Sequence, residues 1–316
     1  IPAMQLSASN KENLNSLEGN LKSVIFGQNH AVEAVVAAIK TAKAGIGNDE
    51  KPISSFLFTG PTGVGKTELT KQLAQFLGID FVRIDMSEFM EKHSISKLIG
   101  SPPGYVGYDQ GGYLTEEINK KPHSVLLLDE IEKAHPDIFN ILLQVLDYGT
   151  LTDSNGRNIN FKNTIIVMTS NTGAVEADNE AVGFIEQESV DKFEKAVSKA
   201  FTPEFRNRLD GIINFNKLDN NNLNSVVEKL LVEVQAKLNL KGIDLEWTDA
   251  VVQKILDEGF DAKLGARPLS RSVDKHIKKP VSAMLIDDKA KKGDTILVGI
   301  KAKQLNFKVK KKEKIT

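Results

Sequence analysis

A short apolar run followed by a glycine-rich loop constrains this chain more than any other stretch. The run, Phe56-Leu57-Phe58, predicts a buried strand, and a helix is expected from about Thr67 to Leu77. The loop between them matches G-x-x-x-x-G-K-[ST] at every position, with Gly60, Pro61, Thr62, Gly63, Val64, Gly65, Lys66 and Thr67. Glycines let backbone N–H groups surround a polyphosphate, and the helix directs its positive end at the same anion. The pattern predicts a nucleotide site rather than a chance turn.

The polar residues beside this loop predict a nucleotide with β- and γ-phosphates, together with Mg²⁺, as its ligands. Lys66 can reach the β- and γ-phosphates, and the Thr67 hydroxyl can ligate Mg²⁺. A second apolar run, Ser124–Leu128, ends in Asp129 and Glu130. Parallel strands bring their carboxyl ends to one edge, where ligands bind. Asp129 therefore suits Mg²⁺ coordination through water, and Glu130 suits polarising the water that attacks the γ-phosphate. The alternative, surface acids that merely end a strand, is weak beside a complete phosphate loop.

A third apolar run carries one more candidate residue. Thr164–Thr169 is followed by Ser170 and Asn171. A polar side chain at Asn171 would lie between the γ-phosphate and the attacking water. Because asparagine is also favoured in turns, the interpretation depends on its position and not on its residue type.

The alternation of apolar strands and helical stretches predicts an α/β fold. Five strands are expected, at Ser55–Thr59, Phe81–Asp85, Ser124–Leu128, Thr164–Thr169 and Gly211–Phe215. This βαβ pattern predicts a P-loop NTPase large domain with a five-stranded parallel sheet between helices. Amphipathic helices over 219–240, 248–258 and 268–287, then two short strands, predict a smaller, mostly helical α+β C-terminal domain. We expect a linker over 1–20, the large nucleotide-binding domain over 21–216 and the small domain over 217–316.

Composition excludes several classes of function. Lys and Arg total 41 against 42 for Asp and Glu, a formal net charge of -1, so the chain has no charge excess that would favour nucleic acid or an anionic membrane. It has no cysteine, which excludes disulfides and fits a cytoplasmic protein. No apolar run is long enough to span a bilayer. A chain that opens at Ile1-Pro2 without an initiator methionine is typical of a fragment.

The order of the motifs resembles a known family over nearly the whole chain. The phosphate loop, Asp129-Glu130 and Asn171 are followed by Phe205-Arg206-Asn207-Arg208 and Gly265-Ala266-Arg267. This series resembles the AAA+ ATPases of the Clp/Hsp100 unfoldase group, and within that group the second ATPase module of the ClpA type. Supporting stretches are Phe26-Gly27-Gln28, Pro102-Pro103-Gly104-Tyr105-Val106-Gly107, the run from Leu126 to Pro136 and the run from Pro203 to Asp210.

The resemblance implies roles for further residues. Arg208 matches the arginine finger that reaches the γ-phosphate held by a neighbouring subunit, a task suited to a planar, permanently charged group. A salt bridge within its own subunit is the alternative, and Arg206 competes for the role. Arg267 matches the second sensor arginine, which links nucleotide state to rotation of the small domain. Ile25 and Phe26 would flank the adenine, although ordinary core packing would explain them nearly as well.

The resemblance also implies a use for two loops. Tyr105 and Val106, between glycines, match the pore loop that grips an extended polypeptide, against the alternative of a tyrosine buried at a loop base. Leu146–Arg157 resembles a second pore-facing loop. The long insertion 172–187 carries Val182-Gly183-Phe184, which resembles the loop that docks on a ClpP-type peptidase. The Val-Gly-Phe tripeptide departs from the Ile-Gly-Leu-like form expected for the ClpA type.

We therefore expect an ATP-dependent unfoldase and translocase that threads polypeptides through a homo-hexameric pore into a ClpP-type peptidase. Its partners would be unfolded or tagged proteins, which an adaptor protein could deliver, with no nucleic acid and no membrane. A ClpB-like disaggregase without a peptidase shares almost every motif and remains an alternative. A DNA-acting AAA+ motor would need a basic stripe, and a nucleotide switch would not need Glu130 as a well-placed base.

Overall fold

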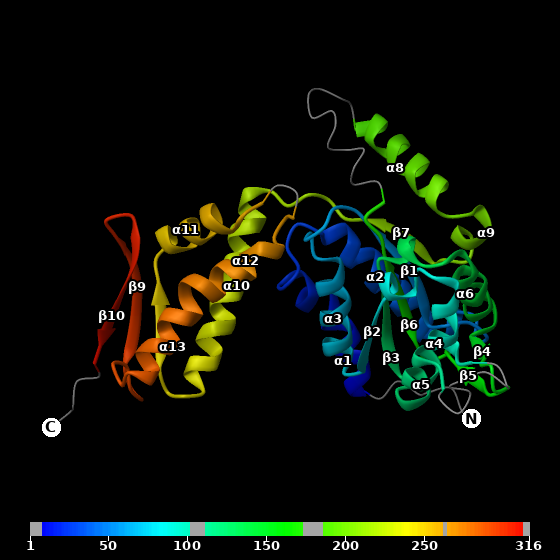
Figure 1. The fold of residues 1–316 in the computed structure, drawn as a ribbon, viewed down its shortest axis with the longest axis horizontal. Coiled ribbons are helices and arrows are strands. Elements are labelled where there is room, and N and C mark those ends of the chain that lie inside the picture. Colours follow the sequence, from blue (N-terminus) through cyan, green and yellow to red (C-terminus); the bar gives the residue numbers. More distant parts are fainter. Residues whose placement is uncertain (1–7, 102–110, 173–185, 262–263, 312–316) are drawn as a thin grey trace. The chain divides into compact units, whose positions relative to one another are not determined.

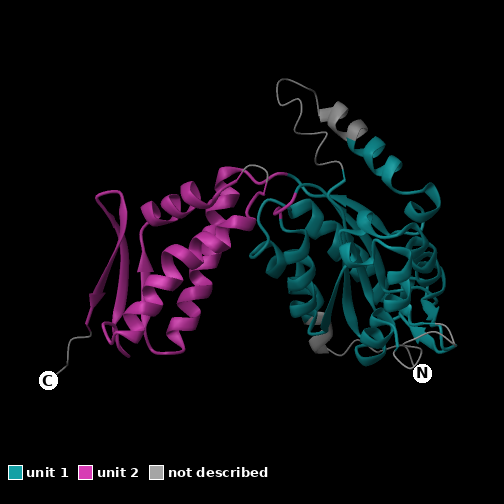
Figure 2. Ribbon diagram, in the orientation of Figure 1, with its two compact units in different colours: residues 1–61, 65–216 teal, residues 62–64, 217–316 magenta. Residues whose placement is uncertain are grey.

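A computed structural model describes residues 8–101, 111–172, 186–261 and 264–311 of the chain (Figure 1). Contacts divide the chain into two compact units, coloured separately in Figure 2. The first unit comprises residues 1–61 and 65–216, and the second comprises residues 217–316 together with the loop residues 62–64. No helix among the described residues combines the length and the apolar character needed to cross a membrane.

The first unit is built on a five-stranded parallel sheet with the strand order β2-β3-β6-β1-β7, which confirms the predicted α/β fold (Figure 1). Its strands are β1 (Ser54–Thr59), β2 (Asp80–Asp85), β3 (Ser124–Asp129), β6 (Ile165–Thr169) and β7 (Gly211–Asn214). Every residue of β1, β3 and β6 is buried. These three strands are central and covered on both faces, so each has an unbroken apolar run in its middle instead of alternating apolar and polar residues.

Helices and single turns surround this sheet. They are α1 (Ala8–Lys22), α2 (Asn29–Thr41), η1 (Ala42–Ile46), α3 (Lys66–Leu77), η2 (Met86–Phe89), η3 (Lys92–Ser94), α4 (Ile95–Ile99), α5 (Tyr113–Lys120), η4 (Ile131–Lys133), α6 (Pro136–Tyr148), α8 (Glu186–Ala200) and α9 (Pro203–Arg206). A short antiparallel hairpin, β4 (Thr150–Thr152) with β5 (Asn158–Asn160), follows α6. β4 and the turn lie within Leu146–Arg157, the segment that was expected to form a second pore-facing loop, and β5 follows it. Asp153 stabilises the turn of this hairpin by accepting from the backbone N–H groups of Asn155 and Arg157.

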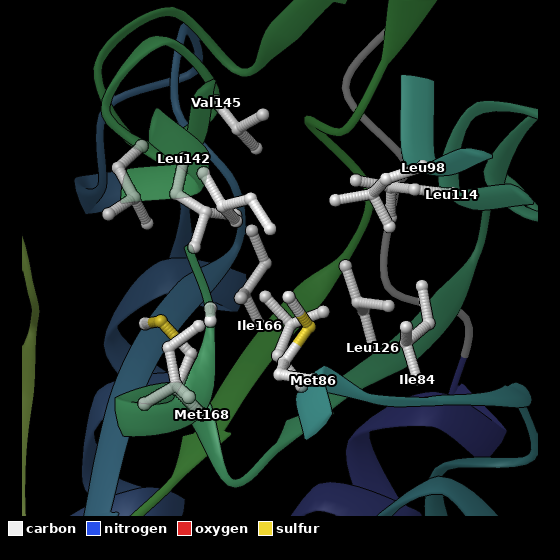
Figure 3. Close-up of a cluster of buried hydrophobic side chains, with 14 of the residues drawn as sticks. Ile84, Met86, Leu98, Leu114, Leu126, Leu142, Val145, Ile166 and Met168 are labelled. Carbon is white, nitrogen blue, oxygen red and sulfur yellow. The ribbon is translucent and has the colours of Figure 1, made fainter. Parts of the chain in front are cut away.

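The main core of this unit lies between the sheet and α6. Leu126 of β3 and Ile166 and Met168 of β6 point into the same cluster as Leu142 and Val145 of α6 (Figure 3). Alternate residues of the same strands are just as buried but are not members of this cluster. The sheet is therefore buried on both faces, and its polar chemistry is confined to the strand ends.

The N-terminal segment differs from the sequence prediction. Residues 1–20 were expected to form a linker, but α1 begins at Ala8, and Leu17 and Leu21 are fully buried. Leu14, Leu17 and Leu21 recur at helical spacing, and α1 packs against α2 and α3. Three apolar residues in a polar stretch are enough to anchor a helix once a partner surface exists. Polar composition concealed that spacing.

The second unit is a helical layer with a three-stranded sheet in the order β10-β9-β8. Its elements are α10 (Asn220–Asn239), β8 (Asp244–Trp247), α11 (Asp249–Gly259), α12 (Arg267–Val273), η5 (Asp274–Lys278), α13 (Lys279–Ile286), β9 (Thr295–Lys301) and β10 (Gln304–Lys310). This confirms the predicted α+β character. β8, a four-residue strand that pairs in parallel with β9, was not predicted from the sequence. The helix expected over 268–287 contains a π-helical turn, η5, in its middle.

Candidate functional site

The glycine-rich loop connects β1 to α3 in the first unit. The positive φ of Gly60, 124°, is a conformation that other residues rarely adopt, and a Cβ atom there would lie 2.4 Å from the carbonyl oxygen of Phe215. Gly65, at φ 109°, precedes the first residue of α3 and accepts the backbone N–H of Leu69. Both glycines are required by the backbone itself. The loop therefore delivers the N-terminus of α3, with Lys66 and Thr67, to the carboxyl edge of the sheet.

Lys66 is a buried cation held by oxygen atoms. Its ammonium donates to the carbonyls of Gly60 and Pro61, the latter at 2.9 Å, and to Asn171 Oδ1 at 3.1 Å. Only 8% of the residue is exposed. Burial lowers the pKa of Lys66 to about 8, because a charged ammonium loses its hydration there, although nearby carboxylates partly oppose the shift. A group in this state gains from an approaching polyanion, which would favour its charged form.

Asp129, the last residue of β3, is held by two donors. The Thr169 hydroxyl donates to Oδ1, and Arg83 Nη2 donates to Oδ2 at 2.6 Å. The side chain of Asp129 is 12% exposed, whereas that of Arg83 is 47% exposed. Arg83 belongs to β2, the strand next to β3, so the sheet itself brings the two together. The carboxylate is thus oriented at the strand edge and charge-balanced by a group that can move into solvent.

Glu130 turns the chain sharply away from β3. Its φ of 57° lies in the left-handed region, which is uncommon for a residue other than glycine. The backbone N–H donates to the Thr169 hydroxyl at 3.1 Å, and the carboxylate accepts from Lys133 Nζ at 2.5 Å. This hydrogen bond to Glu130 raises the pKa of Lys133. The backbone of Glu130 is therefore fixed, while its partly exposed side chain is paired on the surface.

Asn171 lies one residue beyond Ser170, which follows β6. Because β6 lies between β3 and β1, Asn171 is placed between the two acids and the glycine-rich loop. Its side chain accepts from Lys66, and its backbone N–H donates to Glu132 Oε1 at 3.0 Å. The structure thus brings Lys66, Asn171 and the segment that begins at Asp129 to one edge of the sheet.

The donor set fits a Mg²⁺ ion bound together with a nucleotide. Thr67 and Asp129 offer a hydroxyl and a carboxylate, which suit a hard cation that keeps water and phosphate oxygens as its other ligands. Among the described residues no cluster of three or more His, Cys, Asp or Glu side chains could hold a metal by itself. The residues therefore fit Mg²⁺ that arrives with a polyphosphate, not a metal enclosed by protein ligands.

Arg208, the expected finger, forms an ion pair within its own chain. Its Nε donates to Asp147 Oδ2 at 2.6 Å, and its Nη1 donates to the carbonyl of Glu204 at 2.8 Å. The hydrogen bond with Asp147 raises the pKa of Arg208. The competing Arg206 has a buried Nε without a hydrogen-bond partner in the described part of the chain. The two arginines thus differ in environment, although the sequence did not choose between them.

The expected adenine-flanking pair lies between α1 and α2. Ile25 is buried, with 3% exposed, and Phe26 is half-buried. Gln28, two residues on, is fully buried and bonds both backbone groups of Asn216, donating to its carbonyl and accepting its N–H. This fixes the segment to the chain just beyond β7.

The remaining candidates lie in the second unit or outside the described residues. Arg267 is exposed at the start of α12 in the second unit. Tyr105, Val106, Val182, Gly183 and Phe184 lie outside the residues that the structure describes. Conversely, three residues that contact candidate residues directly had no role predicted from the sequence: Glu132, Arg83 and Asp147. Of these three, only Glu132 could have been found from the sequence, because it is a third acid just after Asp129-Glu130.

Family models match most of the chain. A family model described as an AAA domain (Cdc48 subfamily) matches residues 51–212, about half of the chain. A second model, described as the C-terminal D2-small domain of ClpB, matches residues 218–298. The chain spans only about two-fifths of the length of each of three curated relatives.

The relatives carry different names. A ClpA homolog protein of Fuscovulum blasticum is 50% identical over 314 residues, 99% of this chain and 40% of that protein. Chaperone protein ClpB of Oceanobacillus iheyensis is 46% identical over 314 residues, 96% of this chain and 39% of that protein. The ATP-dependent Clp protease ATP-binding subunit ClpC of Staphylococcus saprophyticus is 43% identical over 324 residues, 99% of this chain and 40% of that protein. The family resemblance found from the motifs is confirmed: the chain belongs to the AAA domain family (Cdc48 subfamily), as an ATP-hydrolysing module of the Clp/Hsp100 group with a small C-terminal domain of the ClpB D2 type.

Proposed function

We propose that this chain is the motor module of an ATP-driven protein unfoldase that threads polypeptides through a hexameric pore into a ClpP-type peptidase. The observation that carries the ATP-hydrolysing part is the set of hydrogen bonds at the carboxyl edge of the sheet, from Lys66 through Asn171 to the segment after β3. A phosphate-binding lysine, a polar sensor side chain and an acidic pair are the parts that γ-phosphate transfer to water requires.

Each residue at this edge has a proposed role. The amides of the glycine-rich loop and Lys66 bind the β- and γ-phosphates. Glu130 leaves Lys133, orients the attacking water and accepts its proton. Asn171 holds that water in line with the γ-phosphate. Thr67 and Asp129 hold Mg²⁺, which neutralises charge on the phosphates when bound. Ile25 and Phe26 flank the adenine.

We propose that the active site is completed by a neighbouring protomer. Arg208 exchanges Asp147 for the γ-phosphate bound next door, where its fork stabilises charge in the transition state. A finger that acts between copies requires a ring, and the family resemblance implies a hexamer. Arg267, in the small domain over 217–316, couples nucleotide state to movement of that domain against the large domain over 21–216.

The work output is proposed from the sequence alone. Tyr105 and Val106 on the loop between glycines grip an extended polypeptide, and ATP hydrolysis moves them along a central channel. Val182, Gly183 and Phe184 dock on the peptidase, and we propose a cytoplasmic location. The relatives' names support two different functions, since one relative is named a protease ATP-binding subunit and another is named a chaperone. A ClpB-like disaggregase that acts without a peptidase is therefore the second candidate.

Replacing Glu130 by Gln tests the hydrolytic part of the proposal. The amide cannot accept the proton, so we expect ATP binding to persist and turnover to fall by about 10²- to 10⁴-fold. Nucleotide binding by fluorescence titration and phosphate release measure the two effects. Glu88→Gln, at an exposed glutamate of η2, is the matched control. Turnover that stays at the wild-type level in Glu130→Gln would remove Glu130 from this role.

Two changes separate unfolding from docking. Tyr105→Ala should leave basal ATP hydrolysis nearly intact and cripple unfolding of a stably folded substrate.

Deletion of Val182–Phe184 should abolish degradation with a ClpP-type peptidase and spare both ATP hydrolysis and unfolding. Unchanged degradation in the deletion variant would show that these residues do not dock on the peptidase. A wild-type chain that unfolds substrates but supports no degradation with the peptidase would support the disaggregase instead.

A further inference from the structure

We propose that Glu132 is a positioning residue for ATP hydrolysis, because its carboxylate fixes the backbone of Asn171 and thereby orients the Asn171 side chain toward Lys66. The inference rests on the proposed roles of Lys66 and Asn171 and goes beyond them. Glu132 belongs to η4 (Ile131–Lys133), the turn that follows β3 and Glu130. No role follows for it from the phosphate loop, the acidic pair or the expected finger.

The geometry forms a continuous path across three strands. Glu132 Oε1 accepts from the N–H of Asn171 at 3.0 Å, and Asn171 Oδ1 accepts from Lys66 Nζ at 3.1 Å. β6 pairs with both β3 and β1, so each of the two hydrogen bonds crosses one strand gap at the carboxyl edge. Glu132 is therefore the anchor of a chain of contacts that ends at the phosphate-binding lysine.

The neighbouring acids do not share this task. Asp129 is bonded to Arg83 and Thr169, and the carboxylate of Glu130 is bonded to Lys133. Among these three acids, it is Glu132 whose carboxylate accepts the backbone N–H of Asn171. It thus links the acidic segment to the strand that carries Asn171.

The second carboxylate oxygen shows that Glu132 is enclosed at this edge of the sheet. Glu132 Oε2 is buried and has no hydrogen-bond partner in the part of the chain that the structure describes. A buried acceptor without a partner is costly, so this placement of the side chain calls for an explanation. The hydrogen bond from the Asn171 N–H to the other oxygen, Oε1, supplies one.

This arrangement predicts which kinetic parameter depends on Glu132. A loose Asn171 misplaces the water that it orients, and a misplacement of this kind can cost about 100-fold in rate. The β- and γ-phosphate contacts from the glycine-rich loop do not involve Glu132. Removing the anchor should therefore lower kcat and leave the KM for ATP nearly unchanged.

The test compares three variants by steady-state ATP hydrolysis. Glu132→Met keeps the side-chain volume and removes both acceptors, so kcat should fall by about 10- to 100-fold with KM within about twofold of wild type. Glu132→Gln keeps an oxygen for the Asn171 N–H and should stay within about threefold of the wild-type kcat. Glu88→Ala, on the exposed part of η2, should match wild type. If Glu132→Met does not fold, Glu132→Ala replaces it.

A double-mutant cycle separates positioning from a general structural role. In an Asn171→Ala background the side chain that Glu132 positions is absent, so Glu132→Met should lower kcat no further. Additive losses in the cycle, equal losses in Glu132→Gln and Glu132→Met, or a wild-type kcat in Glu132→Met would each overturn the proposal.

The outcome is distinguishable from failure of the proposed function. If Glu130→Gln hydrolyses ATP at the wild-type rate, the assigned catalytic edge is wrong whatever Glu132 does. If Glu130→Gln is inactive and Glu132→Met is fully active, only the positioning role fails.

Discussion

Lys66 and Arg208 are two cations that the protein treats in opposite ways. Lys66 is 8% exposed, is surrounded mainly by neutral oxygens, and has a pKa lowered to about 8 by burial. The side chain of Arg208 is 26% exposed and is already paired with Asp147, which raises its pKa. The first cation lacks a full counter-charge, and the second has one.

The difference in burial and pairing indicates that the two cations would bind a phosphate in different ways. Burying a charge without an opposite partner is unfavourable, so an incoming anion would stabilise the buried Lys66 ammonium. A partly exposed ion pair contributes little and is exchanged easily, so Arg208 can leave Asp147 for a better acceptor. The account therefore treats Lys66 as the permanent phosphate ligand of its own chain and Arg208 as the movable ligand for another protomer.

The largest expected effect tests the movable cation. Arg208→Ala should lower ATP turnover by about 10³-fold or more in the assembled protein, since finger arginines contribute that much to phosphoryl transfer. Nucleotide affinity should change little, because Lys66 and the glycine-rich loop remain. Phosphate release and nucleotide titration, both at assembly concentrations, check the two statements. A variant that retains wild-type turnover would reduce Arg208 to a surface salt bridge.

An intermediate effect tests the buried cation through pH. Below about pH 8 the folded and unfolded chains both carry protonated Lys66; between about 8 and 10.5 only the unfolded chain keeps the proton, so stability contributed by this group rises with pH. The lowering of the Lys66 pKa from 10.5 to about 8 corresponds to a change of about 3 kcal/mol in the free energy of unfolding. Lys66→Met should therefore be more stable than wild type at pH 7, and the difference should shrink as pH rises.

Urea unfolding of both chains without nucleotide, at several pH values, measures this difference. Comparison with the variant cancels the contributions of all other titrating groups. A difference that does not change between pH 7 and 10 would mean that burial does not shift the pKa of Lys66.

The smallest effect concerns the partner of Arg208. Asp147→Asn removes the ion pair with Asp147 and leaves the one between Arg208 and Glu204, so the free energy of unfolding should fall by no more than about 1 kcal/mol. ATP turnover should stay within about twofold of wild type, because Arg208 itself remains available. Urea unfolding and phosphate release provide the readouts. A loss of turnover as large as in Arg208→Ala would show that the pair, and not the free arginine, is the functional unit.

The parts of the fold that could be predicted are those where a physical constraint leaves a clear pattern in the sequence. Buried parallel strands have unbroken apolar runs, so β1, β3 and β6 were recognisable, and Gly60 and Gly65 mark a backbone that only glycine fits. Short or marginal elements were not recognisable. β8 is four residues long and depends on β9, and α1 depends on the surfaces of α2 and α3.

The site was predictable residue by residue but not as a network. Lys66, Asp129 and Asn171 follow from motif position, whereas the bonds of Glu132 and Arg83 depend on which strands are neighbours. Glu132 contacts a backbone N–H, which has no sequence signature. The same limit applies to Arg206 and Arg208, since only the fold shows that Arg208 is the one bonded to Asp147.

A mixing experiment tests most directly the claim that hydrolysis uses a site shared between protomers. Glu130→Gln and Arg208→Ala are each expected to be nearly inactive alone. In mixed assemblies some sites combine an intact Glu130 with an intact Arg208 from the neighbouring copy, so ATP turnover should reappear on mixing. A mixture that stays as inactive as its two components, under conditions where the wild type assembles and hydrolyses ATP, would contradict the account.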